Sequence, residues 1–418
     1  MRDQTTIRTK FAATAALTAA LFAAGAADAQ DKPKVPKWRI DPYTKNDPKL
    51  MTALGYVSYG PFEFGPVSSE EVDKFLSYDQ FLWVETAHFR IGSSLQNWVV
   101  PFEPDTKAKL RGELTRLAEK LPPGRINPKS TNIDPWLRLH LTALRMEDLY
   151  AEMSQLLGVK DEQFPAGPSS VVRGEGRFMG YGPYLGQQGK YLILLPDKGS
   201  TYVDYLKRWI GRTAMFGQRW NFKEQGSLFY GVAADMEEGR LKHDTALHCN
   251  LAFNISHNLI DGFRNYSYDL PVWIKEGLGH WFERRVHIKW NTFDQNEGGL
   301  ADKKPLYNWK PYMRQLFSGS KFTPLSEAMT WRDYNQINFN DHVALWSRWD
   351  FLMSVDDAPA KFSAFMFEVK GRVTEDWFPD QSDLVGATRD ALSKVYGMTP
   401  LSFDEKWKEW VLKTYPTQ

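Results

Sequence analysis

The pattern of apolar and polar positions predicts a chain that mixes strands with helices. Short, strongly apolar runs predict strands at residues 81–93, 190–195 and 227–233. Apolar residues at helical spacing predict helices at residues 107–121 and 135–157. The chain after residue 285 is predicted to be mostly helical, with helices at 312–317, 341–355, 358–369, 384–396 and 403–415.

The stretch 245–285 is predicted to form two helices joined by a loop of about ten residues. The first helix carries an apolar residue every four positions (Leu247, Leu251, Ile255 and Leu259) and is stopped by Gly262. The second can begin at Pro271, and Trp273, Leu278 and Trp281 give it an apolar side. Because both helices need to bury an apolar side, we expect them to pack together at the centre of the fold.

Two polar residues in this stretch have a distinctive spacing. His257 ends the run FNISH, and eighteen residues separate it from Glu276 in the run WIKEGLGHWFE. This arrangement resembles the site of the gluzincin metallopeptidases, the thermolysin and aminopeptidase N type. Those enzymes carry HExxH on one helix and a Glu, often in an EGLA-like run, on the next helix. Their two His and distant Glu bind Zn²⁺, and the Glu of HExxH is the general base.

The resemblance implies an α+β fold of the two-lobed zincin-like type. The upper lobe would hold a small mixed β-sheet with helices, and the lower lobe would be mostly helical. The domains expected on this basis are a signal peptide at 1–29, an N-terminal extension at 30–80, the zincin-like lobe at 81–290 and the helical lobe at 291–418. The resemblance also implies that strand 227–233 borders the substrate cleft.

The chain departs from the family motif at two positions. Phe253 stands where the family has its first His ligand, and Asn254 stands where it has the general base. A phenyl ring cannot bind a metal, and an uncharged carboxamide cannot take a proton from water. General-base catalysis alone contributes about 10²–10⁴ in rate. We therefore expect a catalytically inactive protein that binds no cofactor.

The sequence also permits a metal site with a different set of ligands. Phe253, His257 and Asp261 share one face of the first helix, and Glu276 and His280 share one face of the second. A Zn²⁺ site could then consist of His257 and Glu276 with Asp261 or His280, one turn away. Without a metal, His257 and Glu276 are still expected to face each other. The ring of Phe253 should then fill the place of the lost ligand, and the carboxylate should raise the pKa of His257.

The N-terminus predicts export. Arg2, Arg8 and Lys10 precede an Ala/Leu-rich run at residues 11–27, and Ala27-Asp28-Ala29 fits the cleavage rule for signal peptides. The expected location is the periplasm of a Gram-negative bacterium or the exterior, with no stable membrane span after cleavage.

Composition narrows the choice of partners. A net charge of +1 argues against nucleic acid, and the single cysteine, Cys249, excludes an intramolecular disulfide and is expected to be a small core residue. The sixteen Trp suggest a glycan binder, but the helical spacing in WSRWD and WKEW favours packing. His88 is expected to be a hydrogen-bonded strand residue, and His140 is expected to be either a surface or a hydrogen-bonded histidine.

These observations leave three hypotheses for function. The first is a binding protein that uses a former peptidase cleft to hold an extended peptide or a cell-envelope component. The second is a metal-dependent peptidase or other hydrolase with the unusual ligand set. The third is a glycan-binding protein.

Overall fold

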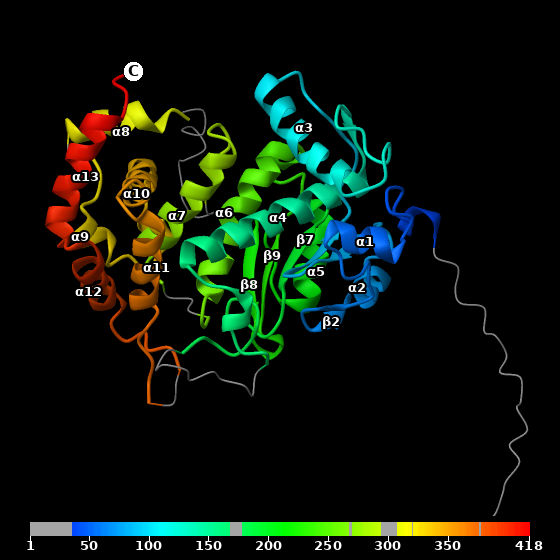
Figure 1. The fold of residues 1–418 in the computed structure, drawn as a ribbon, viewed down its shortest axis with the longest axis horizontal. Helices are drawn as coiled ribbons and strands as arrows, with labels where there is room; N and C mark the ends of the chain where they lie inside the picture. Colours follow the sequence, from blue (N-terminus) through cyan, green and yellow to red (C-terminus); the bar gives the residue numbers. More distant parts are fainter. Residues whose placement is uncertain (1–35, 168–177, 267–269, 294–306, 320, 376–377) are drawn as a thin grey trace, which may run out of the picture. The chain divides into compact units, whose positions relative to one another are not determined.

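The computed structural model describes residues 36–418 except 168–177, 267–269, 294–306, 320 and 376–377 (Figure 1). The predicted signal peptide therefore lies outside the described residues. Residues 1–40 and 41–418 form separate units. The described part of the first unit contains a short 3-10 helix, Lys37–Arg39. All of the elements below belong to the second unit, whose fold class is α+β, as predicted.

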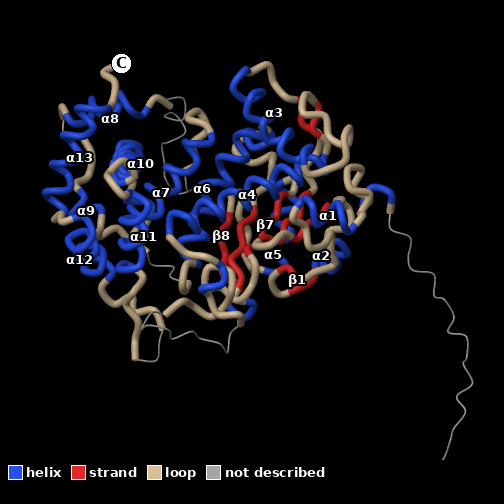
Figure 2. Tube along the Cα trace, in the orientation of Figure 1, coloured by secondary structure: helices blue, strands red, loops and turns tan. Residues whose placement is uncertain are grey.

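A five-stranded mixed sheet forms the β part of this unit (Figure 2). The two outer pairs of strands are antiparallel and the two inner pairs are parallel. In spatial order the strands are β3 (Leu82–Glu85), β4 (Phe89–Ser93), β7 (Tyr191–Leu195), β9 (Ser227–Gly231) and β8 (Gln218–Phe222). The predictions of strands at 190–195 and 227–233 are confirmed.

Two strand predictions need correction. The segment 81–93 is a hairpin of β3 and β4, not one strand, because a turn interrupts it between Glu85 and Phe89. The edge strand beside the site helices is β8, which the sequence pattern did not reveal. Strand β9 lies between β7 and β8, so residues 227–231 form an inner strand and β8 is the edge strand.

Helices cover both faces of the sheet. Successive side chains on a strand point to opposite faces, so neighbouring residues contact different helices. On β9, Phe229 stacks on Tyr205 of α5 (Gly199–Trp209), with ring centroids 5.4 Å apart. The next residue, Tyr230, points to the other face and donates a hydrogen bond to Asn250 of α6 (Asp244–Gly262). Helix α4 (Pro135–Leu157) contacts β3, β4 and α6, so it covers the same face as α6 (Figure 1).

The ends of α4 follow from its sequence. Asp134 caps the first turn by accepting a hydrogen bond from the backbone N–H of Leu137, and Pro135 occupies the first helical position. Gly158 ends the helix in the left-handed conformation at φ 64°. Three more α-helices lie in the first half of the chain: α1 (Pro48–Leu54), α2 (Ser69–Phe75) and α3 (Pro104–Glu119). Two small two-stranded sheets also lie there. One pairs β1 (Glu63–Phe64) with β2 (Val67–Ser68), and the other pairs β5 (Trp98–Val99) with β6 (Asn132–Ile133).

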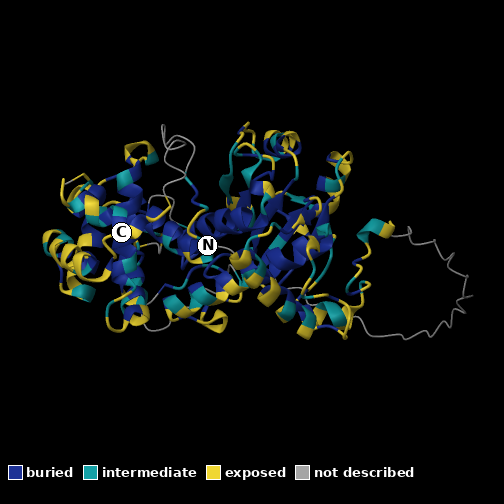
Figure 3. Cartoon of the chain, turned by 90° about the horizontal axis from the view of Figure 1, so that it is seen from above, coloured by how far each residue is buried: buried dark blue, intermediate teal, exposed yellow. Residues whose placement is uncertain are grey.

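Helices α6 and α7 (Val272–Val286) pack directly against each other, which confirms the predicted pairing of the two helices in 245–285. Almost every residue of both helices is buried. Buried residues fill the interior, and exposed residues lie at the surface (Figure 3). Helix α10 (Phe339–Leu352) packs on the other side of α7. The remaining helices are α8 (Trp309–Phe317), α9 (Leu325–Ala328), α11 (Ala358–Val369), α12 (Leu384–Tyr396) and α13 (Pro400–Thr414). Among the described residues, no helix combines the length and the apolar character needed to cross a membrane.

Candidate functional site

The two glycines of the EGLG run allow helices to approach α7 from both sides. A Cβ atom at Gly279 would lie 2.6 Å from Nε2 of His257 and 2.9 Å from the ring of Phe253, both on α6. A Cβ atom at Gly277 would lie 2.3 Å from the indole of Trp349 on α10. Because real Cβ atoms essentially never come this close to another atom, a side chain at either position would force its neighbours to shift. The run therefore holds three helices close together around Glu276.

His257 and Glu276 lie next to each other, as predicted. Nε2 of His257 is 3.9 Å from Oε1 of Glu276, and both side chains are fully buried. This separation exceeds hydrogen-bond reach, so these two atoms are neighbours without a direct hydrogen bond. The expected rise of the pKa of His257 is wrong. Burial lowers the pKa of His257 well below its ordinary value, and the nearby charges of Arg219 and Lys275 act in the same direction.

Phe253 occupies the space beside His257 on the side that faces α7. Its ring centroid is 4.6 Å from that of His257 and 5.0 Å from that of His280. The phenyl ring is completely buried, as are both imidazoles. The position of the first His ligand in the family motif is therefore filled by an apolar ring that excludes water.

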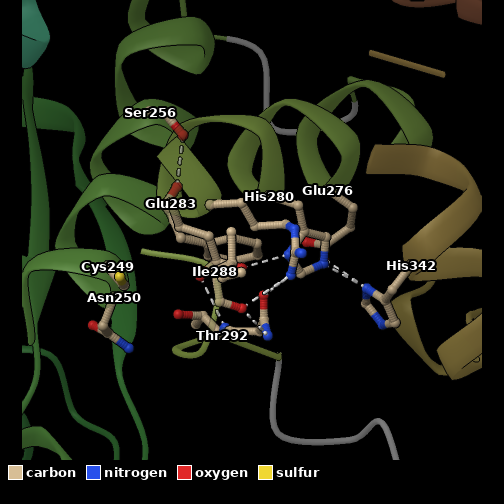
Figure 4. A network of polar contacts seen from close by, with 12 residues as sticks. Cys249, Asn250, Ser256, Glu276, His280, Glu283, Ile288, Thr292 and His342 are labelled. Carbon is tan, nitrogen blue, oxygen red and sulfur yellow. Dashed lines mark hydrogen bonds and ion pairs between the residues drawn. The ribbon is translucent and has the colours of Figure 1, made fainter. Parts of the chain in front are cut away.

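A second group of ligand-type atoms lies on the other side of Glu276. Oε2 of Glu276 is 3.8 Å from Nε2 of His280 and 3.5 Å from Nδ1 of His342, which comes from α10. The two histidine nitrogens are 2.8 Å apart and share a hydrogen bond (Figure 4). All three side chains are fully buried. Glu276, His280 and His342 could hold a metal ion, since their ligand atoms all lie within 4.8 Å of one another.

Glu283 holds the outer nitrogen of His280. Its Oε1 lies 2.6 Å from Nδ1 of His280, and its Oε2 accepts a hydrogen bond of 2.9 Å from the backbone N–H of Thr292. Burial raises the pKa of Glu283 well above its ordinary value, although the N–H of Thr292 opposes that rise. Burial lowers the pKa of His280, and His342 and Arg284 lower it further.

Asp261 does not join this group, although it was a candidate ligand. Its carboxylate faces Lys275, with Oδ2 3.7 Å from Nζ, and both residues line a groove beside β8. The backbone carbonyls of Ile260 and Asp261 accept hydrogen bonds from Nζ of Lys370, which satisfies the end of α6. Asp261 is thus separated from the metal-type cluster and belongs to the wall of the groove.

Asn254 has a structural role at the position of the family's general base. Its Oδ1 accepts a hydrogen bond of 2.6 Å from Nη1 of Arg219, on β8. Its Nδ2 donates to the hydroxyl of Tyr230 and to the backbone carbonyl of Asn250, each at 3.0 Å. A carboxamide can accept and donate at once, whereas a carboxylate can only accept. Asn254 therefore links β8, β9 and α6 and has no basic group to offer.

The groove beside β8 has a volume of about 640 Å³. Four cationic side chains line it, Arg212, Arg219, Lys223 and Lys275, against the two carboxylates Asp261 and Asp333. Aromatic rings from β8 and from the segment around residue 334 complete the wall, and the guanidinium of Arg212 lies 4.8 Å over the ring of Trp220. Within the described residues β8 pairs only with β9, so its outer edge faces away from the sheet.

His342 and Glu283 were not predicted as site residues. A sequence signal existed for each of them. His342 lies between Phe339 and Trp346 on a strongly apolar helix, which is typical of a buried histidine. Glu283 follows His280 by three residues, a spacing that puts both on one face of α7.

Other residues singled out in the sequence have structural roles. Cys249 is buried, and burial raises the pKa of its thiol. His140 is fully buried between Asp41 and Tyr56, whose hydroxyl lies 2.8 Å from its Nδ1. His88 contacts the carboxylates of Glu147 and Asp161. Both histidines are hydrogen-bonded, but His88 lies in the turn between β3 and β4 and not in a strand, and His140 is buried and not on the surface.

The tryptophans mainly pack the interior. Trp273, Trp309, Trp349 and Trp407 are fully buried. The guanidinium of Arg284 lies over the rings of both Trp309, at 3.8 Å, and Trp346, at 4.8 Å. An arginine thus covers ring faces that a sugar would need, which supports the packing interpretation.

The chain matches no protein-family model, no curated protein and no solved structure.

Proposed function

We propose that this protein is a non-hydrolytic, zincin-like binding protein that holds an extended peptide with acidic side chains in the groove along β8. The observation that carries the proposal is the combination of a sheet edge and a cationic wall in one groove. An extended peptide can add to an exposed strand edge through its backbone, while side-chain pockets give specificity. The excess of cationic over acidic groups favours a negatively charged partner.

The proposal that binding does not lead to cleavage rests on positions 253 and 254. The buried ring of Phe253 replaces one metal ligand, and the carboxamide of Asn254 is fixed by Arg219, Tyr230 and Asn250. A base that could take a proton from water is therefore missing at the position where the resemblance implies one. The resemblance itself supports the two-lobed zincin-like description, which is part of this proposal.

Binding of synthetic decapeptides measured by calorimetry tests the proposal. We expect an alternating Glu/Val peptide to bind and a matched Lys/Val peptide to bind at least about tenfold more weakly. The double variant Arg212→Glu with Lys223→Glu should weaken binding of the acidic peptide by a similar factor, since both side chains are exposed in the groove. The control variant Arg111→Glu with Lys120→Glu changes exposed charges on or next to α3 by the same amount and should bind normally.

Mass spectrometry of the same mixtures should show the acidic peptide intact. Equal affinity for the two peptides, or normal binding by the groove variant, would contradict the proposed site. Cleavage of the bound peptide would contradict the non-hydrolytic function.

A further inference from the structure

We propose that Glu276, His280 and His342 form a binding site for one divalent transition-metal ion, best suited to Zn²⁺, that ties α7 to α10. This ligand set differs from the one implied by the gluzincin resemblance, because it uses neither position 253 nor His257. It also stands apart from the peptide groove, so either proposal can fail without the other.

The geometry of the three ligand atoms is close to what zinc requires. With zinc–ligand bonds of about 2.0–2.1 Å in a tetrahedral arrangement, neighbouring ligand atoms lie about 3.3–3.4 Å apart. Oε2 of Glu276 lies 3.5 Å from Nδ1 of His342 and 3.8 Å from Nε2 of His280. The two histidine nitrogens, now 2.8 Å apart, need to separate by about half an ångström. Two imidazoles and one carboxylate suit zinc and similar metals, whereas calcium and magnesium prefer oxygen ligands alone.

One hydrogen has to move before both imidazoles can bind a metal. The hydrogen bond between Nε2 of His280 and Nδ1 of His342 requires an N–H on one side and a lone pair on the other. Where Nδ1 of His342 carries the hydrogen, that ring changes to the tautomer protonated at Nε2. Both facing nitrogens then present lone pairs, and the charge of the two rings stays the same.

Glu283 provides an independent sign of a metal site. Metal-binding histidines usually donate their other ring N–H to a carboxylate, which fixes the tautomer and the orientation of the ring. Oε1 of Glu283 lies 2.6 Å from Nδ1 of His280, and Thr292 holds the other carboxylate oxygen. With the hydrogen on Nδ1, His280 directs the lone pair of Nε2 towards Glu276 and His342 (Figure 4). Glu283 is therefore a positioning residue in this proposal.

Burial indicates a structural metal. Glu276, His280 and His342 are each 0% exposed, and the ring of Phe253 lies against His280. A dication at this point would bring a charge opposite to that of the buried carboxylate of Glu276. Because two ligands come from α7 and the third from α10, the ion would cross-link two helices that already pack together.

Metal analysis of the full chain, purified without a metal-binding tag, tests the proposal. We expect about one zinc per chain after removal of metal by a chelator and readdition of Zn²⁺, with a higher melting temperature than the metal-free protein. Substitution by Co²⁺ should give a visible absorption band of the bound ion that His342→Gln lacks. His342→Gln and Glu276→Gln should each lose stoichiometric zinc, whereas His287→Gln, a histidine outside the cluster, should keep it. Glu283→Gln should retain the ligands and weaken zinc binding about 10–100-fold.

Two results would overturn the proposal. One is metal-free wild-type protein that takes up less than about a tenth of an equivalent of Zn²⁺ or Co²⁺. The other is equal zinc content in wild type and His342→Gln. Should the ligand variants fail to fold, the zinc titration and cobalt spectrum of the wild type, together with Glu283→Gln, still decide the question. Normal peptide binding by a protein that takes up no zinc would contradict the metal site and leave the proposed function intact.

Discussion

The ring centroids of Phe253 and His257 lie 4.6 Å apart, and His257 follows Phe253 by one turn of α6. In the family motif these two positions carry the paired zinc ligands, so an apolar ring packs against the one histidine that is retained. Phe253 also touches His280, which belongs to the second, shifted cluster. The phenyl ring thus packs between His257 and His280 and supports the residues around Glu276.

The first prediction concerns the packing of this ring. Phe253→Ala should destabilise the protein by about 3–5 kcal/mol, because a fully buried phenyl group leaves a cavity that its neighbours fill only partly. The control is Phe102→Ala, since Phe102 is 90% exposed and its loss should change the free energy of unfolding by less than about 0.5 kcal/mol. Urea denaturation of both variants gives the comparison. Equal stabilities would mean that Phe253 does not support the helix pair.

The second prediction concerns the close approach of α6 and α7. Gly279→Ala should destabilise by about 1–3 kcal/mol, because the added methyl group would overlap His257 and Phe253. Gly112→Ala is the matched control, since Gly112 lies in α3 and an added Cβ there meets no atom within 4 Å. That control should stabilise by about 0.5–1 kcal/mol through the higher helix propensity of alanine. Thermal unfolding of both variants should therefore give shifts of opposite sign, and shifts of the same sign would refute the packing argument.

Local sequence patterns predicted much of the fold. Helices such as Pro135–Leu157, Ala358–Val369 and Leu384–Tyr396 lie within the predicted ranges. Asp134 and Asp383 cap the first and the third, and the second has a proline in its first turn and no side-chain cap. The closeness of His257 to Glu276 was also predictable, since both lie on helices adjacent in the chain.

The features missed by the sequence analysis depend on long-range packing. His342 meets His280 across 62 residues of sequence, and no local pattern indicates which side of α7 will receive α10. Strand β8 was missed because most of its residues are half-buried beside the groove, so the run QRWNF lacks the apolar alternation of a typical strand. The wrong direction for the pKa of His257 arose because complete burial outweighs a carboxylate 3.9 Å away.

The third prediction is that the family's metal site can be restored. Phe253→His with Asn254→Glu should bind about one zinc through the introduced imidazole, His257 and Glu276. The background variant His342→Gln removes the shifted cluster, so any zinc must occupy the restored site. The control in the same background is Phe253→Leu with Asn254→Gln, which changes both positions and adds no ligand. Zinc content measured after dialysis separates the two, and equal zinc in both would show that position 253 does not face the former site.

The fourth prediction is a loss of stability as pH rises through the titration of His88. Burial alone would lower the pKa of His88, but hydrogen bonds and charge attraction from Glu147 and Asp161 raise it above its ordinary value. Nδ1 lies 2.6 Å from Glu147 and Nε2 lies 2.9 Å from Asp161. The charged imidazole is therefore favoured in the folded state. Its stabilising contribution is complete below the unfolded pKa of about 6.5 and disappears as pH rises through the higher folded pKa.

Urea unfolding of wild type and His88→Gln at pH 6 and pH 8.5 measures this contribution. The wild type should lose on the order of 1 kcal/mol more stability than the variant between these pH values, a figure kept small because Asp161 is 47% exposed and solvent screens its charge. His287→Gln is a suitable control, because burial lowers the pKa of His287 and its contribution to the pH dependence has the opposite sign. An identical pH dependence in wild type and His88→Gln would show that the two carboxylates do not hold a charged imidazole in the folded protein.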